Sequence, residues 1–209
     1  REGWSRRFQA YLHEHKESSP NAFMRGIRRR ATNGALMGSA PLGFLPDPNA
    51  VRLAATMQTV STHAGATAPF TQCVALAAHY FLFDLGPRGD LVDFISEEVE
   101  WGHESDRDFI ISRMTMTPPK PAMPARSIAA GALWAVTNIQ TLPEIITWAV
   151  QSGGDTDSLA AVAVAIASCS KEIDQELPAI LENSLETEEQ RTRLRRLDTA
   201  LYAMADLAE

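Results

Sequence analysis

The most regular feature of the sequence is the recurrence of apolar residues at spacings of three and four through most of its 209 positions. This period is that of an α-helix with a buried face, whereas strands would show a two-residue alternation, which is not found convincingly anywhere. The sequence therefore predicts an all-α fold. The expected helices are 4–16, 51–60, 67–85, 91–101, 127–138, 142–151, 158–170 and 188–207.

Proline and glycine clusters separate these segments. Pro46-Asp47-Pro48 precedes a helix, Gly86-Pro87-Arg88-Gly89 predicts a turn, and the prolines between 114 and 125 predict an ordered surface loop. The acids from 97 to 108 surround Trp101-Gly102-His103 and predict a solvated face with helix caps. The segments on both sides of each proline or glycine cluster have a helical pattern of apolar residues and a similar composition. We therefore expect one helical domain over 1–209.

The last expected helix is amphipathic, with Leu194, Leu197, Leu201, Met204 and Leu207 on one face. A stripe of this kind more often packs on the core of its own domain than recruits a partner. We therefore expect this helix to pack on the core.

Composition narrows the class of protein. The formal net charge is −7 and no basic stripe is interleaved with aromatic residues, so a nucleic-acid partner is poorly supported. The two cysteines, Cys73 and Cys169, lie in apolar helical pattern, which favours reduced buried thiols over a disulfide. No apolar run reaches membrane-spanning length and no signal peptide opens the chain. We expect a soluble, cytoplasmic protein without a membrane partner.

The segment with the clearest chemistry is Gly153-Gly154-Asp155-Thr156-Asp157-Ser158, which directly precedes an apolar run rich in alanine. That run predicts a helix enclosed by other helices, so two acids at its start need compensation. A single aspartate could serve as the N-cap and meet the unpaired amides. Two carboxylates with nearby hydroxyls instead suit a hard divalent cation, and an extended backbone would turn Asp155 and Asp157 to one side. The segment alone leaves capping and metal binding open.

Two earlier segments are candidates for ligand contact. Residues 32–43 are rich in small side chains that permit close approach of the backbone, and Asn33 offers a donor and an acceptor for sugar hydroxyls. Close packing at a helix-to-loop junction is the favoured explanation for that segment alone. His63 lies between two helical patterns, where a histidine is more often structural but could contact a phosphate or ribose oxygen.

Taken together and in this order, the three segments resemble the ADP-ribosylglycohydrolase family, which includes the enzyme that reactivates dinitrogenase reductase. The resemblance covers residues 32 to about 170 and rests on Asn33-Gly34, Pro41-Leu42-Gly43, Thr62-His63 and the acidic segment ending at Ser158. The family often has threonine where this chain has Ser158, which keeps the hydroxyl, and arginine where it has Gly38.

The resemblance implies a compact orthogonal helical bundle that holds two Mg²⁺ ions, which Mn²⁺ could replace. It implies Asp155 and Asp157 as metal-binding catalytic residues, Ser158 as a third ligand, and substrate contacts from Asn33, Gly34, His63, Gly153 and Gly154. The implied reaction is hydrolysis of the bond between ADP-ribose and a protein side chain or a small acceptor, whose identity the sequence leaves open. A non-catalytic module that binds ADP-ribose or a nucleotide, and a structural helical protein, are the alternatives.

The family's N-terminal Thr-Asp-Asp motif does not occur in the 209 residues, and the chain starts at Arg1 without a methionine. We therefore expect the chain to be the C-terminal portion of a larger domain. Its own N-terminal segment, as a separate chain, is then an expected partner beside the ADP-ribosylated substrate.

Overall fold

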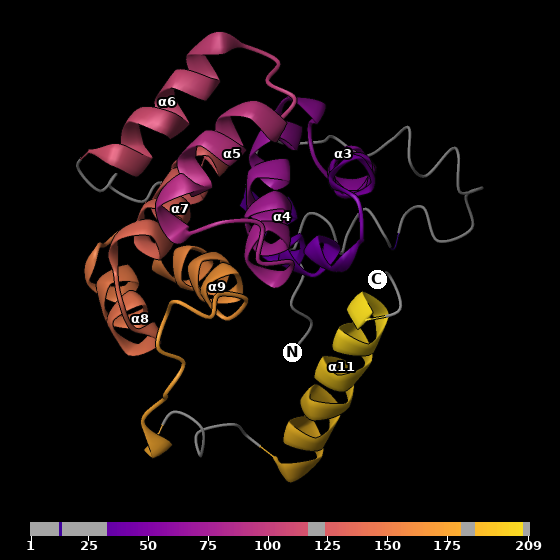
Figure 1. Cartoon of the computed structure of the whole chain (residues 1–209), viewed down its shortest axis with the longest axis vertical. Helices are drawn as coiled ribbons and strands as arrows, with labels where there is room; N and C mark the ends of the chain where they lie inside the picture. The colour runs from indigo at the N-terminus through magenta and orange to yellow at the C-terminus, as the bar shows by residue number, and fades with distance from the viewer. Residues whose placement is uncertain (1–12, 14–32, 117–123, 181–186, 207–209) are drawn as a thin grey trace. The chain divides into compact units, whose positions relative to one another are not determined.

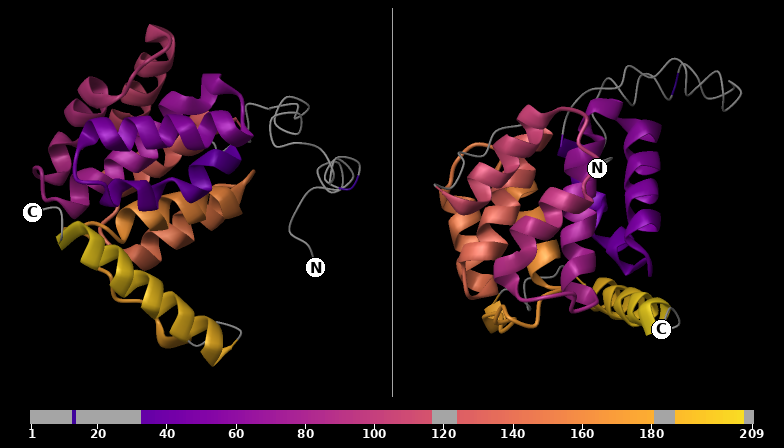
Figure 2. Two further views of the ribbon diagram at one scale, coloured as in Figure 1. Left: turned by 90° about the vertical axis from the view of Figure 1, so that its right-hand side faces the viewer. Right: turned by 45° about the horizontal axis from the view of Figure 1, so that its top comes forward.

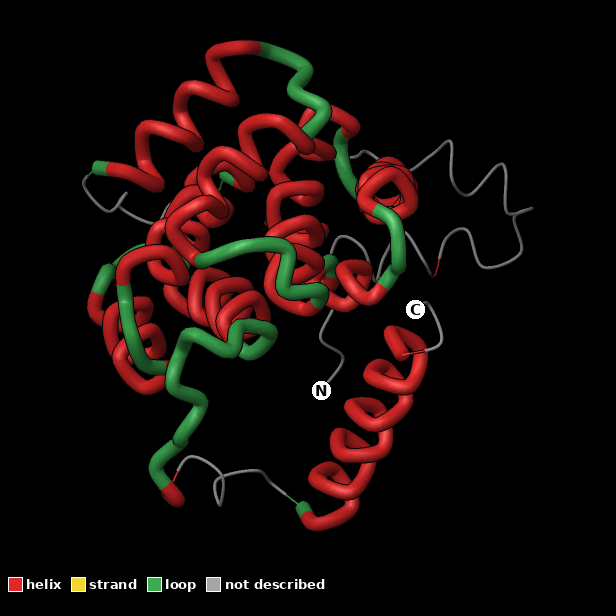
Figure 3. The backbone as a smooth tube through the Cα atoms, in the orientation of Figure 1, coloured by secondary structure: helices red, strands yellow, loops and turns green. Residues whose placement is uncertain are grey.

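The computed structural model describes residue 13 and residues 33–116, 124–180 and 187–206, and this part of the chain is built from helices joined by loops (Figures 1 and 3). The α-helices are α3 (Pro48–Thr62), α4 (Ala68–Leu82), α5 (Leu91–Glu98), α6 (Glu104–Thr115), α7 (Ala125–Asn138), α8 (Leu142–Gln151), α9 (Thr156–Ala167) and α11 (Glu188–Asp206). Short 3₁₀ helices occur at η1 (Asn33–Gly38), η2 (Ala40–Phe44), η3 (Gly65–Thr67) and η4 (Arg88–Asp90). No strand forms within the described ranges, so the all-α prediction is confirmed.

Helix α4 is the central element. Its residues from Ala68 to Phe81 are all buried, which explains why its sequence is apolar or small on every side. It packs against α3 and η2, and also against α5, α7 and α9, an arrangement that can be followed in Figures 1 and 2. Its thiol at Cys73 is free, and burial raises the pKa of that group, in agreement with the expected reduced cysteine.

Gly43 lets η2 lie directly on α4. A Cβ atom at this position would stand 2.7 Å from the backbone nitrogen of His79 and 2.8 Å from the carbonyl oxygen of Ala75. The Nδ1–H of His79 donates a hydrogen bond of 3.0 Å to the carbonyl oxygen of Gly43. For Gly43, the explanation by close packing is therefore correct, and its contacts anchor the segment that also carries Asn33.

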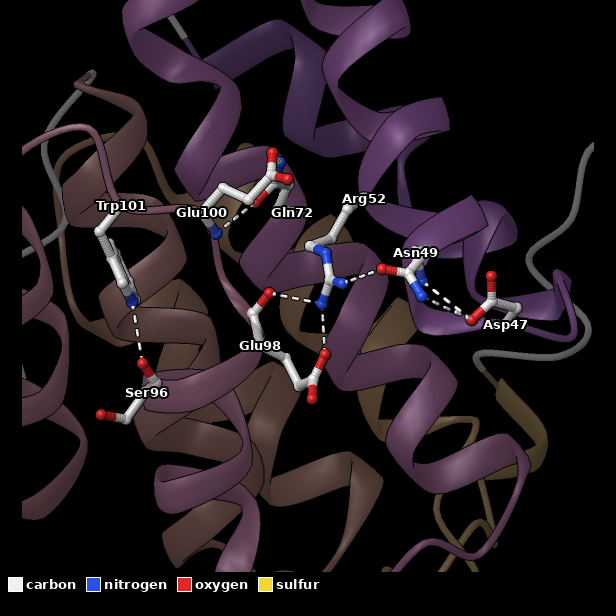
Figure 4. A network of polar contacts seen from close by, with 8 residues as sticks. All are labelled: Asp47, Asn49, Arg52, Gln72, Ser96, Glu98, Glu100 and Trp101. Atoms are coloured by element: carbon white, nitrogen blue, oxygen red, sulfur yellow. Dashed lines mark hydrogen bonds and ion pairs between the residues drawn. The ribbon is translucent and has the colours of Figure 1, made fainter.

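A polar network holds α3 against α4 and α5 (Figure 4). The guanidinium of Arg52 donates to the Glu98 carbonyl oxygen at 2.9 Å and also pairs with the Glu98 carboxylate and the Asn49 amide oxygen. Beside it, the Glu100 amide donates to Oε1 of Gln72 at 2.8 Å. Because this network fixes the N-terminal half of α3, it also limits where the other end of α3, which leads to His63, can lie.

Helix α6 was not predicted. Only Ile110 and Met114 of its residues are buried, so the apolar period is too weak to stand out. Glu104 and Asp106 lie in its first turn, where negative charge favours a helix, but the N-cap residue is His103 and no side chain makes a capping hydrogen bond, so the expected cap is not found at this helix. Helix α5 ends at Glu98 instead of 101, and α9 spans Thr156–Ala167 instead of 158–170. The other boundaries agree within a few residues.

The expected packing of the last helix is wrong for two residues of its stripe, since Leu194 and Leu197 are each 52% exposed. The predicted helix 4–16, apart from His13, and most of the proline-rich loop lie outside the described residues. The described residues from 33 onward belong to one compact unit, and the single domain over 1–209 stays a prediction. None of the helices in the described part combines the length and apolar character needed to cross a bilayer.

Candidate functional site

The candidate site is built around the turn between α8 and α9. Gly153 and Gly154 have φ angles of 72° and 76°, in the left-handed region that side chains with a Cβ rarely adopt. These two residues reverse the chain after α8 ends at Gln151 and deliver Asp155 to the start of α9. The double glycine is therefore explained by backbone geometry, and both glycines are exposed at the rim of the turn.

Asp155 occupies the N-cap position of α9 but makes no side-chain capping hydrogen bond. Its Oδ2 instead accepts a hydrogen bond of 2.5 Å from Nδ2 of Asn33, which lies in η1. The carboxylate of Asp155 therefore faces η1, on another part of the fold, while it stands at the start of α9.

Asp157 follows two residues after Asp155 and lies in the first turn of α9. The two acids are therefore not on one extended segment, contrary to the expectation from the sequence. Their side chains nevertheless come together. Burial alone would raise the pKa of Asp155, but hydrogen bonds with Asp157, Ser158 and Asn33 outweigh it and lower that pKa. The carboxylate of Asp155 is thus held in its charged form.

Ser158 completes the oxygen cluster from the first turn of α9. Its side chain is only 5% exposed. The hydroxyl donates to Sδ of Met37 at 3.6 Å, so it is tied to η1 as well. Two separate contacts, from Asn33 and from Met37, therefore join η1 to the start of α9.

His63 reaches the same segment from α3. It is the C-cap residue of that helix, and its ring faces Gly34, where an added Cβ atom would stand 2.7 Å from Nε2. Burial lowers the pKa of His63, which favours the neutral imidazole. His63 thus packs directly on the segment that carries Asn33 and Gly34. The side chain of Thr62, the residue before His63, is not described.

The structure therefore brings together the predicted site residues from all three segments: Asn33 and Gly34 of η1, His63 after α3, and Asp155, Asp157 and Ser158 at α9. Asn33 is 7% exposed and bonded to Asp155, so its amide supports the acid cluster; direct contact with a substrate stays a prediction. Met37 was not among the predicted site residues. A methionine in a segment of small residues carries no signal until the fold sets it beside a hydroxyl.

Two carboxylates and a hydroxyl form an oxygen-rich set that fits Mg²⁺, a hard cation that binds through few protein oxygens and keeps several waters. The set is small, since no group of three or more His, Cys, Asp and Glu side chains gathers anywhere in the described ranges. Helix α9 is also less enclosed than expected, because Ala161 is exposed. Asp157 is itself exposed, so solvent reaches the cluster at this acid.

Comparison with known families agrees with the resemblance in the sequence. The family described as ADP-ribosylglycohydrolase matches residues 2–208, nearly the whole chain. A search of curated proteins gave no significant match.

Proposed function

The chain belongs to the ADP-ribosylglycohydrolase family, and on this basis we propose that it is a Mg²⁺-dependent hydrolase that removes ADP-ribose from a modified protein side chain or a small conjugate. Family membership supports a hydrolase in general. The observation that carries the finer proposal is the hydrogen bond between Asn33 and Asp155, because it orients the first acid of α9 from a buried residue of η1.

In this proposal Asp155, Asp157 and Ser158 are the protein's oxygen ligands. A bound cation there would hold ribose hydroxyls, orient water and offset developing charge. Asn33 fixes the Asp155 carboxylate by holding one of its oxygens. A second ion and replacement by Mn²⁺ are part of the proposal, with further ligands supplied from outside this cluster, for instance by an N-terminal segment in a separate chain.

The substrate approaches, in this proposal, over the exposed glycine turn. Gly153 and Gly154 present backbone without side chains at the rim, so a ribose ring can come close to Asp155. His63, held on Gly34, is the nearby group suited to a ribose or phosphate oxygen, and its neutral form can donate from one ring nitrogen and accept at the other. Asn33, Gly34 and His63 thus form one wall and the glycine turn another.

The test is release of ADP-ribose from ADP-ribosyl-arginine, ADP-ribosyl-serine and an ADP-ribose ester, with Mg²⁺ and with a chelator present. We expect Mg²⁺-dependent release from at least one of these. Asp155→Ala and Asp157→Ala should each abolish it. Asp93→Ala is the control for Asp157→Ala, because Asp93, like Asp157, is an exposed acid in the first turn of a helix, here α5, and it should leave the rate unchanged. Full activity of both site variants would refute the assignment.

A second candidate, a module that binds ADP-ribose or a nucleotide without cleaving it, is favoured by one observation. The described residues bring only two carboxylates to the cluster. Calorimetry with ADP-ribose, with and without Mg²⁺, separates the two functions: Mg²⁺-dependent binding with no turnover of any of the three substrates supports the module.

A further inference from the structure

Two arginines from neighbouring helices are held on one aromatic ring. The guanidinium carbon of Arg113, in the last turn of α6, lies 5.6 Å from the centroid of the Phe109 ring. That of Arg126, in the first turn of α7, lies 4.9 Å from the same centroid. Both distances are those of cation–π interactions. Phe109 itself packs against the core, so its ring holds both guanidiniums around one place on the surface.

The charges of these two arginines are not neutralised within the described ranges. Neither guanidinium forms an ion pair or a hydrogen bond with another described residue, and this includes Asp106 and Asp108, the acids nearest to Phe109 in the sequence. Residues 117–123, which join α6 to α7 in the sequence, contain no acid. Two like charges beside one ring repel each other unless a partner compensates them. The arrangement is therefore suited to an anion.

A phosphoryl group matches this pair of cations. A guanidinium over a ring still has N–H groups along its edge, and these can form two parallel hydrogen bonds to the oxygens of an anion. A carboxylate has one charge and two oxygens, so a single arginine satisfies it. A phosphomonoester carries a charge of about −1.5 to −2 at neutral pH and offers three acceptor oxygens, which suits two arginines.

We propose that Arg113 and Arg126 form a binding site for a phosphoryl group, with Phe109 as the platform that positions both guanidiniums. The ligand is inorganic phosphate or a phosphomonoester carried by a partner, since both present the same oxygens. The site shares no residue with the acid cluster at the start of α9. The inference therefore does not depend on the proposed hydrolase activity.

The experiment measures binding of inorganic phosphate, and of a short neutral peptide with one phosphoserine, to the whole chain by phosphorus nuclear magnetic resonance. Ionic strength is constant and Mg²⁺ is left out, so that a metal at the acid cluster cannot hold the phosphate. Arg113→Gln and Arg126→Gln each remove one charge at similar side-chain length. We expect each to weaken binding about three- to tenfold, and the double variant to abolish it.

Two further variants test the site against general charge and against simple packing. Arg193→Gln is the matched control, because Arg193 is an exposed arginine of α11 that makes no ion pair within the described ranges, and its loss changes the net charge equally. It should bind as the wild type does. Phe109→Leu keeps an apolar side chain against the core but removes the ring, so it should also weaken binding. The arginine variants lie at the surface, so the test stands even if Phe109→Leu fails to fold.

The outcomes decide the inference and identify the source of the ligand. It is overturned if the wild type binds neither probe, if the unphosphorylated peptide binds equally well, or if Arg193→Gln weakens binding as much as the site variants do. Wild-type binding by Phe109→Leu overturns the platform role of the ring. With the site upheld, tighter binding of the phosphoserine peptide than of inorganic phosphate identifies a phosphorylated partner, whereas equal affinities identify the phosphoryl group alone.

Discussion

Asn33 and Asp155 are joined by a hydrogen bond from Nδ2 to Oδ2 although 122 residues separate them in the chain. Asn33 is buried in η1, and Asp155 stands at the start of α9. The bond holds Oδ2 of Asp155 toward η1 and leaves Oδ1 as the other carboxylate oxygen. Together with the contact between Met37 and Ser158, it joins η1 to the start of α9.

Removing this contact should reduce activity more than stability. Asn33→Ala leaves Asp155 free to rotate, and we expect ADP-ribose release to fall about 10- to 100-fold, the range for groups that orient metal ligands. The measurement is the initial rate with the best of the three substrates. Asn138→Ala is the control, because Asn138 also donates through Nδ2, but to the backbone oxygen of Trp134, and should leave the rate unchanged. An unchanged rate in Asn33→Ala would remove the positioning role of Asn33.

Gly34→Ala should displace His63 at little cost in stability. The added Cβ meets Nε2, at the far end of a side chain that can swing aside, so we expect a loss of less than about 1 kcal/mol in the free energy of unfolding. Activity should drop by about 100-fold if the ring contacts substrate, because small misplacements are costly in an active site. Urea denaturation and initial rates give the two values.

The same substitution at another glycine should behave in the opposite way. Gly43→Ala places its Cβ against the backbone of α4, which cannot move aside, and overpacking of this kind costs about 1–3 kcal/mol. His63→Ala tests the cause of the Gly34 effect: if Gly34→Ala still lowers activity in that background by the full factor, the histidine is not the group through which Gly34 acts.

Gly153→Ala isolates the effect of backbone conformation. Nothing lies within 4 Å of the added Cβ, and φ is 72°, so strain alone should destabilise the protein by about 1 kcal/mol. Gly153→Asn should cost less, because asparagine tolerates this region better. Gly102→Ala, also with open space around it but without a positive φ, is expected to be neutral. Equal stabilities of the Gly153 and Gly102 variants in urea would contradict this account.

His79 predicts a stability that depends on pH. Burial lowers the pKa of His79 below its ordinary value of 6.5, against smaller opposing effects of its hydrogen bond to Gly43 and of nearby acids. The unfolded chain then binds the proton more readily than the folded one, so stability is complete above about pH 6.5 and is lost as pH falls below that value. His79→Asn, whose Nδ2 can replace the Nδ1 donor to Gly43, should flatten this dependence between pH 7 and 5.5. Parallel urea midpoints for both proteins over that interval would exclude His79 as the cause.

Many of the helices could be predicted because the spacing of apolar residues along each of them is a local property of the sequence. Helix α8 was predicted with its observed bounds, since Thr141 caps it, Pro143 lies at its start and the apolar period is strong. Helix α6 was missed because most of its residues are polar and only Ile110 and Met114 are buried, in packing that depends largely on α7. Packing against another helix cannot be recognised within the short stretch of sequence that forms α6.

The sequence by itself determined the helical class and the family, and it showed a glycine pair and two neighbouring acids at the start of α9, because apolar spacing, glycine pairs and adjacent acids are local properties of the chain. Only the tertiary structure decided what each of these residues faces. Asn33 pairs with Asp155, Met37 accepts from Ser158, and His63 packs on Gly34. The physical reason is that such contacts depend on how α3, η1 and α9 are held around the buried α4, and no one segment encodes that arrangement.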